Sequence, residues 1–198
     1  MKILGVDSSA KSASIALIED GEILSEFFIN VGLTHSQTLA PMVKNVLDNT
    51  NTNLKDLGLF AVSFGPGSFT GIRIGVSLVK GMAMPFNTPC IGVSTLYSMA
   101  FNLLNENAVV CAVMDARCNQ VYNAIFDIKD GKIQRLTKDR AISIVDLYKE
   151  LKFFQKKVIF VGDGAELCYN KKNNYNLNAY IAPKSLRLQR ASSVAFAG

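Results

Sequence analysis

The chain has 198 residues, 49% of them hydrophobic, and a mean hydropathy of +0.21, so it can bury one large core or two smaller ones. A net charge of +5 permits contact with nucleic acid or an acidic partner but does not identify one. The only histidine, His35, excludes a two-histidine metal site, and the short, charge-interrupted apolar runs exclude a membrane span.

The cysteines and the N-terminus indicate a cytoplasmic protein. The four cysteines show no Cys-x-x-Cys spacing, which is typical of free thiols in a reducing compartment: Cys90, Cys111, Cys118 and Cys168. The sequence enters a strand pattern directly after Lys2, without the layout of a signal peptide.

The first half is predicted to follow the order β-β-β-α-β-α. We expect strands at residues 2–7, 12–19, 22–30 and 59–64, and helices at 39–47 and 68–84. Asp20-Gly21 is a hairpin signal between the second and third strands. In the first helix, apolar residues recur at helical spacing: Leu39, Met42, Val43, Val46 and Leu47.

The same order then recurs. Strands are expected at 109–115, 120–128, 132–136 and 157–161, with a helix at 143–152. Asp130-Gly131 repeats the hairpin signal, and Gly162-Asp163-Gly164 repeats a strand-to-helix turn. We therefore predict an α/β protein with two halves, residues 1–104 and 105–198, of which the second is smaller and less complete.

A glycine-rich segment joins the strand at 59–64 to the second helix. It reads Gly65-Pro66-Gly67-Ser68-Phe69-Thr70-Gly71-Ile72-Arg73-Ile74-Gly75. Such a turn presents backbone N–H groups to an anion, but no Gly-Lys-Ser/Thr follows, so it is not a Walker A loop. The candidate nucleotide or anion contacts are Asp7, Gly67, Ser68 and Arg73. Close packing of helix on strand is the alternative interpretation, to which the sequence gives equal weight.

The duplicated unit resembles the actin, acetate and sugar kinase superfamily, which is built from two ribonuclease-H-like halves. In that superfamily an aspartate of the first hairpin helps to hold metal and phosphate, and Asp7 matches its position. The hairpin here carries Ser8 and Ser9 where the kinases carry a glycine, and those side chains crowd the approach of a phosphate. Asp7 capping its own turn is therefore at least as good an interpretation.

A narrower resemblance covers nearly the whole chain. The motifs occur in one order: residues 3–9, the glycine-rich segment, Gly92-Val93-Ser94-Thr95-Leu96, Met114-Asp115-Ala116-Arg117 and Val161-Gly162-Asp163-Gly164. This pattern is similar to the TsaB (YeaZ) family, the non-catalytic partner in bacterial synthesis of threonylcarbamoyladenosine on transfer RNA. The sequence stops at Gly198 without the closing segment that is usual in the family.

The resemblance implies a scaffold with no catalytic residue and no metal ligand of its own. It implies a TsaD-like catalytic partner, contact with a TsaE-like ATPase and with transfer RNA through the complex, and a homodimer when the chain is alone. ATP or ADP and a divalent metal are expected in the assembled complex, none held tightly by this chain, and no membrane is implied. Thr95 and Met99 align with the metal histidines of TsaD, and neither residue suits such a metal.

The helices are the candidate partner surface. The second helix has two apolar stripes, Phe69-Ile72-Val76-Val79-Ala83 and Ile74-Leu78-Met82, and one sheet cannot cover both. We expect the partner to contact Leu39, Met42, Val43, Val46, Ile74, Leu78, Val79 and Met82. A helix enclosed within its own domain is the alternative.

Two enzyme hypotheses stand beside the scaffold. A nucleotide-dependent phosphotransferase would use Asp7, Gly67 and Gly164 around ATP, although Ser8-Ser9 counts against it. A peptidase would have His35 as its only evident base.

Overall fold

The computed structural model describes residues 1–32, 34–175 and 177–198, and it divides into two compact units. Unit 1 comprises Met1–Ser98 together with Gln189–Gly198, and unit 2 comprises Met99–Leu188. The predicted boundary at residue 104 lies close to this division, but residues 189–198 belong to unit 1, whereas the sequence predicts them in the second half. They pack on the sheet of unit 1, a long-range contact that local sequence patterns do not encode.

Unit 1 contains a five-stranded sheet in the order β3-β2-β1-β4-β5. The strands are β1 (Lys2–Asp7), β2 (Ala13–Glu19), β3 (Glu22–Ile29), β4 (Leu59–Gly65) and β5 (Cys90–Ser94). β1–β2 and β2–β3 pair antiparallel, whereas β1–β4 and β4–β5 pair parallel. The Asp20-Gly21 turn has positive φ at both residues, as a tight hairpin requires.

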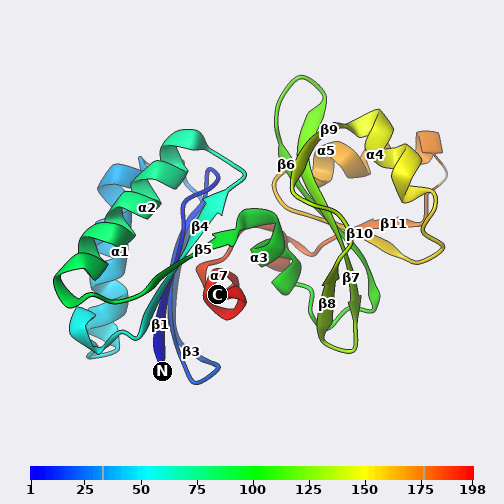
Figure 1. Cartoon of the computed structure of the whole chain (residues 1–198). Coiled ribbons are helices and arrows are strands. Elements are labelled where there is room, and N and C mark those ends of the chain that lie inside the picture. Colours follow the sequence, from blue (N-terminus) through cyan, green and yellow to red (C-terminus); the bar gives the residue numbers. More distant parts are fainter. Residues whose placement is uncertain (33, 176) are drawn as a thin grey trace. The chain divides into compact units, whose positions relative to one another are not determined.

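Helices cover both faces of this sheet. α1 (His35–Asn49) and α2 (Phe69–Ala83) lie on one face and α7 (Ala191–Ala197) on the other (Figure 1). Short 3₁₀ turns follow the first two helices, η1 (Leu54–Asp56) and η2 (Met84–Phe86). The main core lies under α1 and α2 and includes Leu4, Val6, Ile15, Phe60 and Val79.

Helix α7 approaches β1 closely because Gly5 has no side chain. A Cβ at Gly5 would lie 2.2 Å from the backbone oxygen of Ala191. The carboxylate of Glu26 on β3 then anchors the start of α7. It accepts hydrogen bonds from Arg190 Nη2 (2.6 Å) and Nε (3.1 Å), and from the Ser192 backbone N (3.1 Å) and Oγ (2.8 Å). Residues 189–198 are thus an integral part of unit 1.

Unit 2 repeats the topology of unit 1. Its sheet runs β11-β10-β6-β7-β8, with β9 also paired to β7. The strands are β6 (Ala108–Asp115), β7 (Gln120–Lys129), β8 (Lys132–Arg135), β9 (Arg140–Ser143), β10 (Val158–Val161) and β11 (Ala179–Ile181). The helices are α4 (Ile144–Leu151), α5 (Ala165–Tyr169) and α6 (Lys184–Arg187), with η3 at Lys172–Tyr175. In sequence order each sheet pairs its first strand antiparallel to the second and parallel to the strand after the helix, so the predicted duplication is confirmed.

Helix α3 (Thr95–Phe101) contains the division between the two units. The sequence did not predict α3, α6 or the strands β5, β9 and β11. No helix among the described residues has both the length and the apolar character needed to cross a bilayer.

Candidate functional site

Asp7 ends β1 and is buried, with 1% of its surface exposed. Its Oδ1 accepts hydrogen bonds from the Ser9 backbone N (3.0 Å) and Ser9 Oγ (2.9 Å), and its Oδ2 accepts one from Ser63 Oγ. Burial raises the pKa of Asp7, while these hydrogen bonds and the nearby His35 act in the opposite direction. The carboxylate therefore caps its own hairpin, which is one of the two interpretations drawn from the sequence.

The glycine-rich segment packs directly against that hairpin. A Cβ at Gly67 would lie 2.2 Å from the Ser9 backbone oxygen, and a Cβ at Gly71 would lie 2.1 Å from that of Ser8. The Ser68 backbone N donates to the Ser9 carbonyl at 2.6 Å. Chain atoms thus occupy the space immediately in front of Gly67 and Gly71.

The N–H groups of Ser68 and Gly71, at the start of α2, are therefore used within the fold. Ser68 is the N-cap of the helix, and its Oγ accepts the Gly71 N–H at 3.2 Å. Ser8 Oγ donates to the Gly71 carbonyl at 2.9 Å. This geometry favours close packing of helix on hairpin over a phosphate cradle. Sequence reasoning weighed the two equally because the partner of the glycines, residues 8–9, lies more than fifty positions earlier.

The other polar candidates lie beside this hairpin or on the surface. His35, half-buried at the start of α1, lies with its Nε2 2.8 Å from the Ala10 carbonyl oxygen. Arg73 is exposed and stacks on the exposed Phe69 ring at 3.9 Å. The structure brings Asp7, Gly67 and Ser68 together, whereas the Arg73 guanidinium lies on the ring of its own helix.

Burial corrects part of the predicted partner surface. Five of the eight residues are at most 4% exposed and belong to the core under α1 and α2: Leu39, Met42, Val43, Val46 and Val79. Ile74, Leu78 and Met82 are only partly buried. The stripe of α2 that faces the core is Gly71-Gly75-Val79-Ala83, and Phe69, assigned to it from the sequence, is 69% exposed. When a helix has two apolar stripes, helical spacing alone does not identify the stripe that packs against the core.

A groove of about 710 Å³ runs between α1 and α2. Its apolar lining comes from Ala40, Val43, Leu47, Leu54, Leu78, Met82 and Phe86, and its polar lining from Lys44, Asp48, Thr52, Asn53 and Lys55. Phe86 is 47% exposed. Sequence reasoning missed Leu54 and Phe86 because they lie in the short η1 and η2 turns rather than in a periodic helix.

The described residues do not fit a metal ion. Among them no group of three or more His, Cys, Asp or Glu side chains could hold one. Thr95 and Met99, aligned with the metal histidines of the catalytic relative, are both fully buried, at 0% exposure. The thiols of Cys111 and Cys168 are also buried, and burial raises the pKa of Cys168 to about 12, so this thiol is a poor nucleophile.

Comparisons with known proteins agree with this architecture. The family model for TsaD, tRNA N6-adenosine threonylcarbamoyltransferase, matches residues 28–198. The chain is 29% identical to the tRNA threonylcarbamoyladenosine biosynthesis protein TsaB of Bacillus subtilis over 100% of this chain and 87% of that protein. It is 40% identical to TsaB of Escherichia coli over 67% of this chain and 58% of that protein.

Solved structures give the same result at the level of the fold. A Pseudomonas aeruginosa protein described as similar to the peptidase YeaZ superposes with a TM-score of 0.83 and 25% identity, over 98% of this chain and 88% of that one. A polyphosphate/ATP-glucomannokinase from Arthrobacter superposes with a TM-score of 0.58 and 11% identity, over 98% and 97%. The fold is therefore that of the actin and sugar kinase superfamily, and the chain belongs to the TsaB (YeaZ) family.

Proposed function

We propose that this chain is a non-catalytic subunit of the machinery that makes threonylcarbamoyladenosine on transfer RNA, and that it binds a TsaD-like catalytic subunit through the groove between α1 and α2. Membership of the TsaB family supports the pathway. The groove supports the contact, because Leu78, Met82 and Phe86 leave apolar surface accessible there.

A scaffold role is also favoured by the contacts that Asp7 and the glycine-rich segment make within this chain. The Asp7 carboxylate is hydrogen-bonded to Ser9 and Ser63, and the glycine-rich segment packs against the hairpin. We propose that the chain alone holds neither nucleotide nor metal tightly, and that ATP or ADP and a divalent metal act in the assembled complex. Titration calorimetry of the isolated chain with ATP and magnesium tests this, and micromolar binding lost in Asp7→Asn would favour the phosphotransferase instead.

Complex formation is best tested by size-exclusion chromatography with light scattering. The chain is run alone, then mixed with its cognate TsaD-like subunit. We expect a heterodimer peak that grows at the expense of a homodimer, since both assemblies would use the same groove. A chain that ignores that subunit under these conditions would contradict the proposal.

Two variants test whether the TsaD-like subunit binds in the groove between α1 and α2. Ala40 is exposed and lines the groove, so Ala40→Arg fills it without touching the core. Leu78→Asp adds a charge to the same groove. We expect either change to abolish the heterodimer, because burying an unpaired charge costs several kcal/mol, about 3 or more. Val145→Asp is the matched control, since Val145 on α4 is 51% exposed and lies in unit 2.

A further inference from the structure

The net positive charge of the chain resides entirely in unit 2. Residues 99–188 carry 14 Lys and Arg against nine Asp and Glu, a net charge of +5, which equals that of the whole chain. Unit 1, which carries the α1–α2 groove, is therefore neutral overall. An uneven distribution of this kind concentrates any attraction for a polyanion on one unit.

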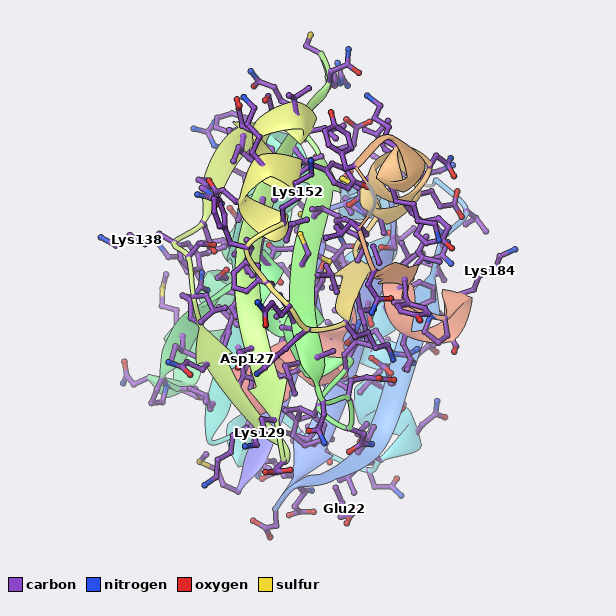
Figure 2. The ribbon with its side chains drawn as sticks, turned by 90° about the vertical axis from the view of Figure 1, so that its right-hand side faces the viewer. Glu22, Asp127, Lys129, Lys138, Lys152 and Lys184 are labelled. Carbon is purple, nitrogen blue, oxygen red and sulfur yellow. The ribbon has the colours of Figure 1, made fainter. Side chains whose placement is uncertain are left out.

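Two recesses on unit 2 share Lys129. The first, about 320 Å³, is lined by Asn107, Ile128, Lys129, Lys156 and Lys157. The second, about 400 Å³, is lined by Asp127, Lys129, Asp130, Lys132, Ile133 and Gln134. Lys152 begins the loop that leads to Lys156, and Figure 2 shows Lys152, Asp127 and Lys129 in that order down the face of unit 2 that is turned towards the viewer. We call Lys129, Lys132, Lys152, Lys156 and Lys157 the lysine surface.

The carboxylates nearby do not neutralise this surface. Lys156 pairs with Asp127 at 2.6 Å and Lys157 with Glu106 at 2.9 Å. Within the described residues no ion pair involves Lys129, Lys132 or Lys152, although Lys152 lies 5.6 Å from the centre of the Tyr175 ring. Asp130, in the turn between β7 and β8, is the one further carboxylate that lines the recesses. The lysine surface thus keeps an excess of positive charge.

Lys129 and Lys132 face each other directly across the β7–β8 ladder. Like charges in directly opposed positions destabilise a sheet, so this pair costs the fold a small amount of stability. A bound chain of phosphates would offset that repulsion. Lysines are compact point charges that suit phosphates irrespective of sequence.

An exposed aromatic ring directly follows one of these lysines in the chain. Phe153 directly follows Lys152 at the end of α4 and is 85% exposed. Lysines beside an exposed aromatic ring are the usual composition of surfaces that bind unpaired nucleotides, because the ring stacks on a base while the cations contact phosphates.

We propose that the lysine surface of unit 2, with Phe153, binds RNA, and that its ligand is the transfer RNA on which the proposed complex acts. The proposal rests on the function proposed above and adds to it a direct contact by this chain, separate from the α1–α2 groove.

The test measures binding of a fluorescein-labelled, unmodified transfer RNA transcript by fluorescence anisotropy between 50 and 200 mM salt. It uses the full chain alone and the chain mixed with the TsaD-like subunit. Lys129→Gln with Lys132→Gln is expected to weaken binding and to reduce the slope of log K against log salt by about 1 to 2, since each phosphate contact contributes about 0.7 to 0.9. Phe153→Ala is expected to weaken binding about tenfold with an unchanged slope.

The matched control is Lys11→Gln with Lys184→Gln. It removes the same charge from two exposed lysines outside the lysine surface. Equal losses in both double variants would overturn the placement of the RNA on this surface. Unchanged RNA binding in Lys129→Gln/Lys132→Gln would overturn the proposal, and if binding to the TsaD-like subunit then fell, the surface would belong to a protein contact instead.

Failure of this proposal is distinguishable from failure of the proposed function. Ala40→Arg is expected to lose the heterodimer while the chain alone keeps its affinity for RNA. The lysine variant is expected to keep the heterodimer and lose affinity for RNA. If Ala40→Arg keeps the heterodimer while the lysine variant loses RNA affinity, the groove assignment fails and the RNA surface stands.

Discussion

Gly71 on α2 offers a sharp test of how the glycine-rich segment works. In an open helical position, replacing glycine by alanine stabilises a protein by about 0.5–1 kcal/mol. At Gly71 the new Cβ would lie 2.1 Å from the Ser8 carbonyl oxygen and 3.0 Å from the His35 ring. Overpacking of this kind costs about 1–3 kcal/mol, more than the helix gains. We therefore expect Gly71→Ala to lower the free energy of unfolding by about 1–2 kcal/mol.

Gly81 is the matched control, because it lies in the same helix and a Cβ there would meet nothing within 4 Å. We expect Gly81→Ala to stabilise unit 1, so the melting temperatures of the two variants should differ by about 5–10 °C. Thermal unfolding followed by far-UV circular dichroism measures this difference. If Gly71→Ala is as stable as Gly81→Ala, the helix does not depend on close contact with the hairpin, and the glycines are free to serve a ligand.

Three further changes test the core and the anchoring of α7. Burial raises the pKa of Asp7 above 3.8, so its contribution to stability is full below that value and is lost as the pH rises through the pKa of the folded state. The stability of wild type relative to Asp7→Asn should therefore fall as the pH rises above about 4 in urea unfolding, and a rise would show that hydrogen bonds to the carboxylate outweigh burial. Glu26→Ala should cost about 2 kcal/mol and speed hydrogen exchange in residues 191–197, and unchanged protection there would contradict the anchoring role. Val79→Asp should prevent folding, since Val79 is 0% exposed, whereas Leu78→Asp should fold, and equal thermal stability of the two would refute the assignment of the stripes.

Local signals predicted much of the fold. Asp130-Gly131 has positive φ at both residues, so this hairpin forms where the turn chemistry requires it. β5 (Cys90–Ser94) was missed because it is a short edge strand whose first three residues are exposed and lack a periodic pattern. α1 was predicted over 39–47 but begins at His35, because the apolar stripe reports only the part of a helix that contacts the core.

The candidate site was less predictable, for a geometric reason. Helical spacing located Val79 and Leu78 on different stripes of α2, but which stripe meets the sheet depends on the approach of the helix to residues 8–9. Because Gly71 and Gly75 let α2 pack closely against Ser8, the side of the helix that carries them faces the core, and Leu78 lines the groove. Charge is equally ambiguous, because the lysines are scattered along the sequence and only the β7–β8 register places Lys129 opposite Lys132.

The position of α7 has a consequence for synthesis on the ribosome. One face of the unit 1 sheet is covered by residues 189–198, which follow unit 2 in the chain. At 5–20 residues per second, translation of the intervening segment of about 90 residues takes about 5–20 s. Throughout that interval Gly5 and its neighbours on β1 lack their partner helix, while unit 2 emerges with all of its own strands. The order of translation therefore favours completion of the second unit before the first.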